Sequence, residues 1–169
     1  CGSYLPHWKK ERDYKHTYSS SKKYGGGVLL DLSHELDYIQ WIFGKIKKID
    51  FAKIKKISNL KIKSEDYVNL IGKINKNNFS INLNYFTINP KREIVIDGKN
   101  FSLSADLINN TIKFFENGKT KNIKFNINKN FTYKMQHQCL LNNNFKISCS
   151  YKNGKNTMLL IDKIKNLNN

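Results

Sequence analysis

The clearest pattern of hydrophobic positions lies in residues 28–43, directly after three consecutive glycines, Gly25, Gly26 and Gly27. At about 100° per residue, the apolar side chains of this segment gather on one side of a helix, as in a helix that packs on a core. They are Leu29, Leu32, Leu36, Ile39 and Phe43. Gly44 is the predicted end of the helix, because glycine is common just past a helix C-terminus.

Alternation of apolar and polar residues predicts strands further along the chain. The first predicted hairpin joins residues 67–74 to a strand from Phe79 to Tyr85, with residues 75–78 as the turn. A second joins residues 93–97 to 101–105, and a third joins residues 111–115 to 123–127 around Asn117 and Gly118. The isoleucine spacing in residues 45–63 fits a helix or a strand, and residues 1–24 are predicted to be irregular.

Two more helices are predicted near the C-terminus, over residues 131–141 and 157–167. The second would bury Leu160, Ile161, Ile164 and Leu167. Successive hairpins flanked by helices indicate an α+β fold, with a largely antiparallel sheet and helices on one face. A chain of 169 residues can bury a substantial core, so we expect residues 1–169 to form a single domain.

The formal net charge is +17, which suits a protein that binds nucleic acid or an anionic surface. The basic residues are almost all lysines, however, and Arg12 and Arg92 are the only arginines available for bidentate recognition. The lysines are scattered singly and in pairs, which favours a solvated basic surface. A basic nucleic-acid-binding domain is therefore a less favoured alternative.

Cysteine usage and hydropathy limit the class further. Cys1, Cys139 and Cys149 form no Cys-x-x-Cys pair, and their odd number favours free thiols in a reducing compartment, the cytoplasm. His137 with the last two cysteines matches no zinc spacing, so no metal site is predicted. No run approaches the roughly 18 apolar residues of a membrane helix, and we expect no membrane association.

The polar face of the predicted helix at residues 28–43 carries Asp31, His34 and Tyr38. One interpretation is structural, because a carboxylate in the first turn stabilises a helix N-terminus while the imidazole is merely exposed. In the other, the glycines allow close approach of a ligand, and Asp31 orients or charge-balances His34, which moves a proton. Periodicity alone does not decide between them.

The run GGGVLLDLSHELDYIQWIFG resembles the segment that opens the second domain of the glucose–fructose oxidoreductase / inositol dehydrogenase (Gfo/Idh/MocA) family, in which glycines precede an Asp…His…Asp helix. The resemblance implies a substrate-binding domain and a homodimer through a sheet face, and it favours a strand in residues 45–63. It extends to Tyr4-Leu5-Pro6-x-Trp8, Asp13-Tyr14, residues 64–70, residues 90–94 and residues 106–111.

The resemblance also implies roles for individual residues. His34 would be the acid/base for a sugar hydroxyl, and Asp31 would position the substrate or the histidine. Further substrate contacts would come from Tyr4, Trp8, Asp37 and Tyr38, and weaker cofactor contacts from Gly26 and Gly27. Tyr4 and Trp8 flank Pro6, which stiffens their loop. Their rings would either line a sugar-binding pocket or pack over the glycine turn.

Many family members place the histidine four residues after the aspartate. Here Asp31 and His34 are only three residues apart, with Ser33 between them. The shorter spacing resembles a subgroup associated with bacterial surface sugars. The shorter spacing leaves open which catalytic role each of Asp31, His34 and Asp37 has. The implied substrate is a sugar or sugar derivative, with or without a phosphate or nucleotide attached.

Family members carry a dinucleotide-binding domain before this one, whose glycine-rich turn places pyrophosphate at a helix N-terminus. This sequence contains neither Gly-x-Gly-x-x-Gly nor the family's Glu-Lys-Pro motif. The resemblance therefore implies the C-terminal domain of an NAD(P)-dependent oxidoreductase, inactive alone, with NAD or NADP bound mainly by the missing N-terminal Rossmann domain. The alternative is a non-catalytic sugar-binding or assembly module of the same fold.

Overall fold

The computed structural model describes residues 1–128, 130–144 and 148–167. The chain forms two compact units: the first comprises Cys1–Pro90 with Tyr151–Asn169, and the second comprises Lys91–Ser150. Each unit has its own antiparallel sheet. The candidate site residues named above all lie in the first unit.

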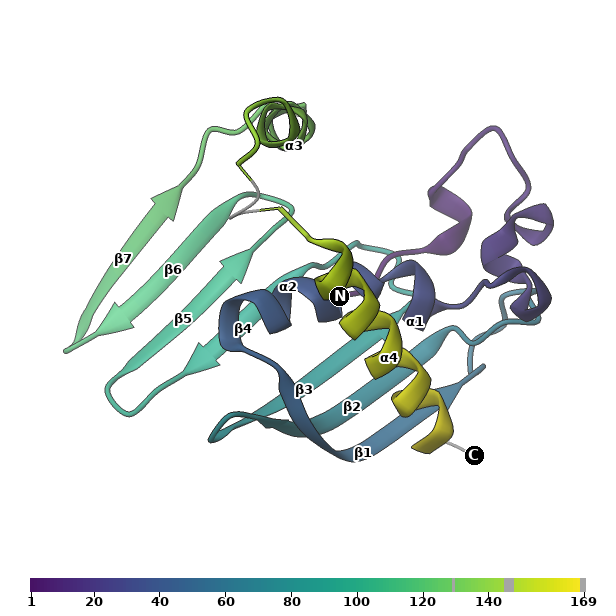
Figure 1. Ribbon diagram of the computed structural model, residues 1–169, viewed down its shortest axis with the longest axis horizontal. Coiled ribbons are helices and arrows are strands. Elements are labelled where there is room, and N and C mark those ends of the chain that lie inside the picture. Colours follow the sequence, from purple (N-terminus) through teal and green to yellow (C-terminus); the bar gives the residue numbers. More distant parts are fainter. Residues whose placement is uncertain (129, 145–147, 168–169) are drawn as a thin grey trace. The chain divides into compact units, whose positions relative to one another are not determined.

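The sheet of the first unit contains β1 (Ile46–Lys55), β2 (Tyr67–Ile74) and β3 (Asn77–Asn84), in that spatial order (Figure 1). The strand predicted within residues 45–63 and the first predicted hairpin are confirmed. The turn is shorter than predicted, because Ile74 pairs with Asn77 and Asn75 adopts a positive φ of 53°. That left-handed conformation suits asparagine and permits a two-residue connection.

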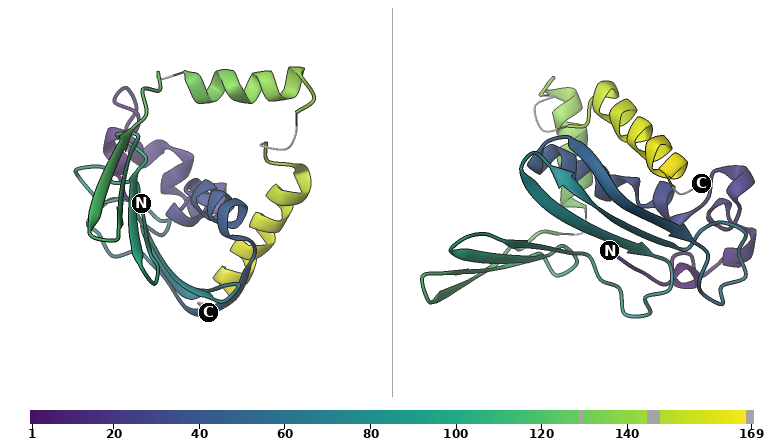
Figure 2. Two further views of the ribbon diagram at one scale, coloured as in Figure 1. Left: turned by 90° about the vertical axis from the view of Figure 1, so that its left-hand side faces the viewer. Right: turned by 90° about the horizontal axis from the view of Figure 1, so that it is seen from below.

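Three helices belong to this unit: α1 (Val28–Asp31), α2 (Ser33–Phe43) and α4 (Tyr151–Leu167). The latter two lie against each other on one face of the three-stranded sheet (Figures 1 and 2). The prediction of one helix over 28–43 was wrong at Leu32, whose φ of −102° and ψ of 24° separate α1 from α2. Leu29, Leu32 and Leu36 are all buried, so the apolar side continues across the break.

The last helix also differs from its prediction. It begins six residues earlier, at Tyr151, and its first residues are mostly exposed, so no apolar stripe marks this start in the sequence. Its predicted stripe is correct for Leu160, Ile161 and Ile164, which are buried, but Leu167 is 52% exposed. The buried stripe therefore ends one turn before the helix does.

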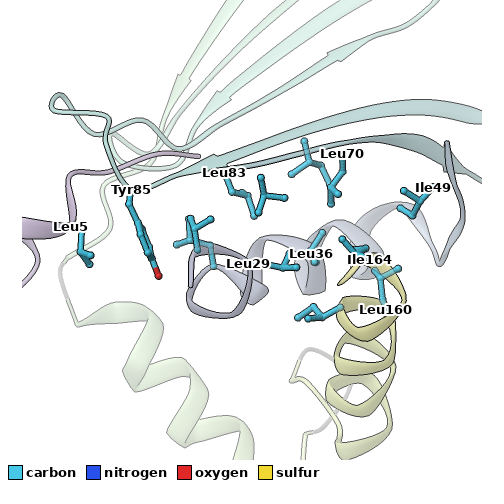
Figure 3. Packing of buried hydrophobic residues seen from close by; sticks show 14 of the residues in the cluster. Leu5, Leu29, Leu36, Ile49, Leu70, Leu83, Tyr85, Leu160 and Ile164 are labelled. Atoms are coloured by element: carbon cyan, nitrogen blue, oxygen red, sulfur yellow. The ribbon is translucent and has the colours of Figure 1, made fainter. Parts of the chain in front are cut away.

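The core of the first unit lies between the sheet and these helices (Figure 3). Alternate residues of β2 and β3 face inward, as the period of a strand requires. They meet apolar residues from α1, α2 and α4. The most deeply buried members are Val28, Leu29, Leu36, Val68, Leu70, Leu83, Tyr85, Ile161 and Ile164.

The N-terminal segment, residues 1–24, contains only short 3₁₀ turns, in agreement with its predicted irregularity. It is attached to the end of β3 by backbone hydrogen bonds. The Ser3 amide donates to the Asn84 carbonyl at 3.2 Å, and the Leu5 amide donates to the Tyr85 carbonyl at 2.9 Å. Trp8 of this segment contacts the Tyr85 ring.

The second unit contains the sheet β4 (Glu93–Asp97), β5 (Phe101–Asp106), β6 (Thr111–Glu116) and β7 (Lys119–Lys124), followed by α3 (Phe131–Leu141). The bounds of α3 match the prediction. The last strand was predicted at 123–127 but begins at Lys119. Asn117 and Gly118 have positive φ angles of 49° and 73°, so they form a two-residue turn that pairs Glu116 with Lys119.

The predicted α+β class with antiparallel strands is confirmed, with the strands divided between two sheets. In the ranges that the structure covers, none of the helices combines the length and the apolar composition needed to cross a membrane.

Candidate functional site

The glycine turn before α1 is packed against the protein's own atoms. A Cβ at Gly26 would lie 2.1 Å from the Tyr18 carbonyl oxygen, and one at Gly27 would lie 2.1 Å from a carboxylate oxygen of Glu65. Gly27 also has a φ of 128°, a value that residues other than glycine rarely adopt. The space at both positions is filled from within the chain. Gly26 and Gly27 therefore form no open cradle for a pyrophosphate, and these residues do not fit a dinucleotide site.

Glu65 is a site residue that the sequence analysis missed. Its backbone carbonyl accepts from the Val28 amide at 3.1 Å, and its carboxylate lies against Gly27. Burial raises the pKa of this carboxyl group, and hydrogen bonds from its own backbone amide and from the Leu29 amide partly oppose that shift. Within the described residues, Oε1 is buried without a hydrogen-bond partner. The resemblance of residues 64–70 to the family could have identified Glu65, which is next to Asp66 in that run.

Asp31 is held by a residue far away in the sequence. Tyr85, directly after β3, is fully buried, and its hydroxyl donates to Asp31 Oδ2 at 2.5 Å. Burial, followed by this hydrogen bond to a carboxylate, raises the pKa of the Tyr85 hydroxyl. Figure 3 shows the Tyr85 ring extending from the sheet beside Leu29 of α1. Asp31 therefore has a fixed orientation at the end of α1.

His34 is positioned by Glu35, and not by Asp31 as the helix spacing suggested. His34 Nε2 lies 3.1 Å from Glu35 Oε1, with side-chain exposures of 54% and 3%. The other oxygen of Glu35 accepts from the Tyr38 hydroxyl at 2.5 Å. A carboxylate at Nε2 favours the tautomer protonated there, which leaves Nδ1 as the basic nitrogen of a half-exposed imidazole. The His34–Glu35 pair is thus held on its buried side by Tyr38 and exposed on the other side.

Asp37 contacts the last helix. Thr157 Oγ1 donates to Asp37 Oδ1 at 3.0 Å, and Gln40 Nε2 donates to Thr157 Oγ1 at 3.3 Å. These bonds join α2 to α4 around a buried threonine. Asp37, which was predicted to contact the substrate, therefore helps to hold α2 against α4.

Tyr4 and Trp8 lie on the Tyr85 side of this region. The Trp8 ring meets the Tyr85 ring edge to face, with centroids 5.3 Å apart, and Trp8 Nε1 donates to Ser3 Oγ at 2.8 Å. Tyr4 is half-buried against the core and meets the His7 ring at 4.8 Å. The structure thus brings Trp8, Tyr85 and Asp31 together in one chain of contacts, which Tyr4 adjoins.

Across the described ranges, no three histidine, cysteine or acidic residues cluster in a way that could hold an ion. Cys1, Cys139 and Cys149 form no disulfide with one another.

Comparison with known families assigns residues 2–104 to a model described as the GFO/IDH/MocA C-terminal domain. This range covers both the glycine turn and the His34–Glu35 pair.

Solved structures share the fold at low sequence identity. The chain superposes on the UDP-N-acetylglucosamine 3-dehydrogenase GnnA from Acidithiobacillus ferrooxidans with a TM-score of 0.71 and 11% identity, covering 97% of this chain and 50% of that one. A dehydrogenase from Clostridium difficile gives 0.66 and 15%, covering 82% and 47%. The 3-ketoreductase KijD10 from Actinomadura kijaniata, in complex with TDP-benzene and NADP, gives 0.66 and 10%, covering 83% and 47%.

The chain spans about half the length of these solved structures. No curated protein sequence matches it significantly.

Proposed function

The chain belongs to the GFO/IDH/MocA C-terminal domain family, and from this premise we propose that it is the substrate domain of an NAD(P)-dependent oxidoreductase acting on a sugar derivative. Two proteins of similar fold support this substrate class, a UDP-N-acetylglucosamine 3-dehydrogenase and a 3-ketoreductase crystallised with TDP-benzene and NADP. The three-residue spacing of Asp31 and His34 supports a role in bacterial surface-carbohydrate synthesis.

The observation that carries the proposal is the His34–Glu35 contact. A half-exposed imidazole with a buried carboxylate 3.1 Å from Nε2 is suited to accept a proton at Nδ1. The proton would come from the hydroxyl group of the sugar carbon that is oxidised, and the reverse transfer would accompany reduction. The buried carboxylate would stabilise the imidazolium that forms.

Asp31 would act beside this pair by binding a substrate hydroxyl. Tyr85 holds Asp31 Oδ2, so the second carboxylate oxygen is available as an acceptor in a fixed direction. Tyr4, Trp8, Asp37 and Tyr38 remain proposed substrate contacts, with Trp8 the member closest to the Tyr85–Asp31 pair.

The cofactor would be bound outside this chain's glycine turn. NAD(P) would supply the hydride acceptor or donor. Because Gly26 and Gly27 are filled in by Tyr18 and Glu65, we assign its binding to a separate dinucleotide-binding domain preceding this one in the full-length protein. The solved structures are about twice as long as the region they share with this chain, which supports that assignment. This domain alone would then be inactive.

The protein would act as a homodimer in the cytoplasm. The face of the first sheet opposite α2 and α4 exposes Phe51 by 46% and Ile71 by 43%, which supports pairing of two copies through a sheet face. The three cysteines form no disulfide with one another, which supports a reducing compartment. Light scattering in moderate salt should give the mass of a dimer, and a monomer mass would contradict the pairing.

The direct test is hydride transfer by the full-length protein with candidate nucleotide-linked sugars. His34→Ala should lower turnover by on the order of 100-fold or more, because it removes the proton acceptor. His137→Ala, an exposed histidine of α3, is the matched control and should leave turnover unchanged. Unchanged turnover in His34→Ala would remove this residue from the mechanism.

A further inference from the structure

A hollow of about 350 Å³ opens in the N-terminal segment, away from the His34–Glu35 pair. We call it the Lys9–Tyr18 pocket; its lining residues are Lys9, Arg12, Asp13, His16, Thr17 and Tyr18. Its volume is within the range of small-molecule sites. A second, smaller hollow shares Lys9, Arg12, Thr17 and Tyr18 with it and continues to Trp8.

The charge of this pocket is positive. Within the described part of the chain, the Arg12 guanidinium has no ion pair, and Lys9 contacts the Tyr18 ring with its ammonium 6.0 Å from the ring centroid. The one acidic lining residue is already paired. Asp13 accepts from the Lys15 amide at 3.0 Å and lies 3.4 Å from Lys15 Nζ and 4.0 Å from His16 Nε2. Lys9 and Arg12 therefore keep a net positive charge available to a ligand.

The residue types define the ligand class. A guanidinium binds phosphate oxygens in a bidentate manner, and a nearby ammonium adds a second positive charge, so the pair suits a diphosphate better than a neutral sugar. Tyr18 is 55% exposed beside them and offers an aromatic face against which a nucleobase can stack. Arg12 is also one of only two arginines in a lysine-rich chain.

The pocket is connected to the proposed substrate site through packed side chains. Trp8 lines the smaller hollow and meets Tyr85 edge to face, and Tyr85 donates to Asp31. Two side-chain contacts, Trp8–Tyr85 and Tyr85–Asp31, therefore separate the pocket from the proposed substrate site.

We propose that the Lys9–Tyr18 pocket binds the diphosphate of a nucleoside diphosphate sugar, with Arg12 and Lys9 as the phosphate ligands and Tyr18 against the base. This inference rests on the proposed function and names its substrate class. It assigns the sugar end to the Asp31 side and the nucleotide end to the N-terminal segment.

Calorimetric titration of the 169-residue chain with UDP, inorganic pyrophosphate and uridine, at moderate salt, tests the site. UDP should bind most tightly, pyrophosphate more weakly, and uridine weakest of all. Arg12→Gln and Lys9→Gln should each weaken UDP binding by on the order of 10-fold or more, since each removes a charge-assisted contact. Lys10→Gln removes the same charge from the adjacent exposed position and should leave UDP binding unchanged.

Equal losses in Lys10→Gln and Arg12→Gln would overturn the site, because they would show diffuse attraction to a basic surface. Absence of UDP binding, or binding unaffected by Arg12→Gln, would also overturn it. Equal affinity for UDP and pyrophosphate would overturn the nucleotide assignment.

Turnover in the full-length protein separates this inference from the function on which it rests. If Arg12→Gln leaves KM unchanged while His34→Ala abolishes turnover, the pocket is wrong and the proposed function stands. If UDP binding depends on Arg12 but no sugar derivative is oxidised or reduced, the proposed function is wrong and the pocket stands.

Discussion

The Tyr85 hydroxyl donates to Asp31 Oδ2 at 2.5 Å across 54 residues of sequence. The bond connects the residue after β3 to the last residue of α1, and the Tyr85 ring is completely buried. It therefore fixes the direction of the Asp31 carboxylate from the core side.

Tyr85→Phe should lower the free energy of unfolding by about 1–3 kcal/mol, because Asp31 loses its donor while remaining half-buried. Chemical denaturation of the chain measures this loss. Tyr24→Phe removes the same hydroxyl from a ring that is 70% exposed and should have no measurable effect. Equal stabilities of the two variants would mean that the bond to Asp31 contributes nothing.

Gly27→Ala should destabilise the fold strongly, by about 2 kcal/mol or more, because it combines an unfavourable φ with overlap on Glu65. Gly25→Ala is the matched control. Gly25 also has a positive φ, of 78°, but a Cβ there would meet nothing within 4 Å, so it should cost only about 1 kcal/mol. Thermal unfolding of both variants measures the difference, and equal losses would argue against the packing of Glu65 on Gly27.

The pH dependence of stability should show a destabilising contribution from Glu65. Burial raises its folded-state pKa above the ordinary value of 4.5, so the charged form is less favourable in the folded chain than in the unfolded one. The contribution of this group to the free energy of unfolding therefore falls as pH rises from 4.5 through the folded-state pKa.

Glu65→Gln should remove that fall, so its stability relative to the parent chain should be higher at pH 7 than at pH 4. Denaturation at several pH values measures the difference. Asp13→Asn is a control of opposite sign, because hydrogen bonding to Lys15 lowers the pKa of Asp13. Its parent carboxylate stabilises the fold above the ordinary pKa and loses that effect as pH falls. A Glu65→Gln profile parallel to that of the parent chain would contradict the burial of this charge.

Periodicity was sufficient for the elements whose burial is one-sided. The alternation in β2 and β3 and the apolar stripe of α2 followed from sequence because each packs one face on the core. The break at Leu32 did not follow, since the residues on both sides have helical periodicity and only three-dimensional packing separates α1 from α2. The start of α4 was missed because its first residues are mostly exposed and include Gly154, a poor helix former, so neither an apolar stripe nor helix propensity marks them.

The candidate site was predicted in part. Helical spacing paired His34 with Asp31, whereas the structure places the Nε2 atom of His34 beside the adjacent Glu35. Tyr85 contacts Asp31 and Glu65 contacts Gly27, both from positions distant in the sequence, and no local pattern indicates such contacts. The buried carboxylate of Asp66, next to Glu65, accepts from the Ile57 and Ser58 amides at 2.8 and 3.1 Å.

The central claim is that buried Glu35 positions His34 for proton transfer, and a double-mutant cycle on turnover of the full-length protein tests it most directly. Glu35→Gln should lower kcat on the order of 10-fold when His34 is present and have little further effect in the His34→Ala background, with unfolding of each variant measured in parallel. Independent, multiplicative losses from the two substitutions would contradict the account.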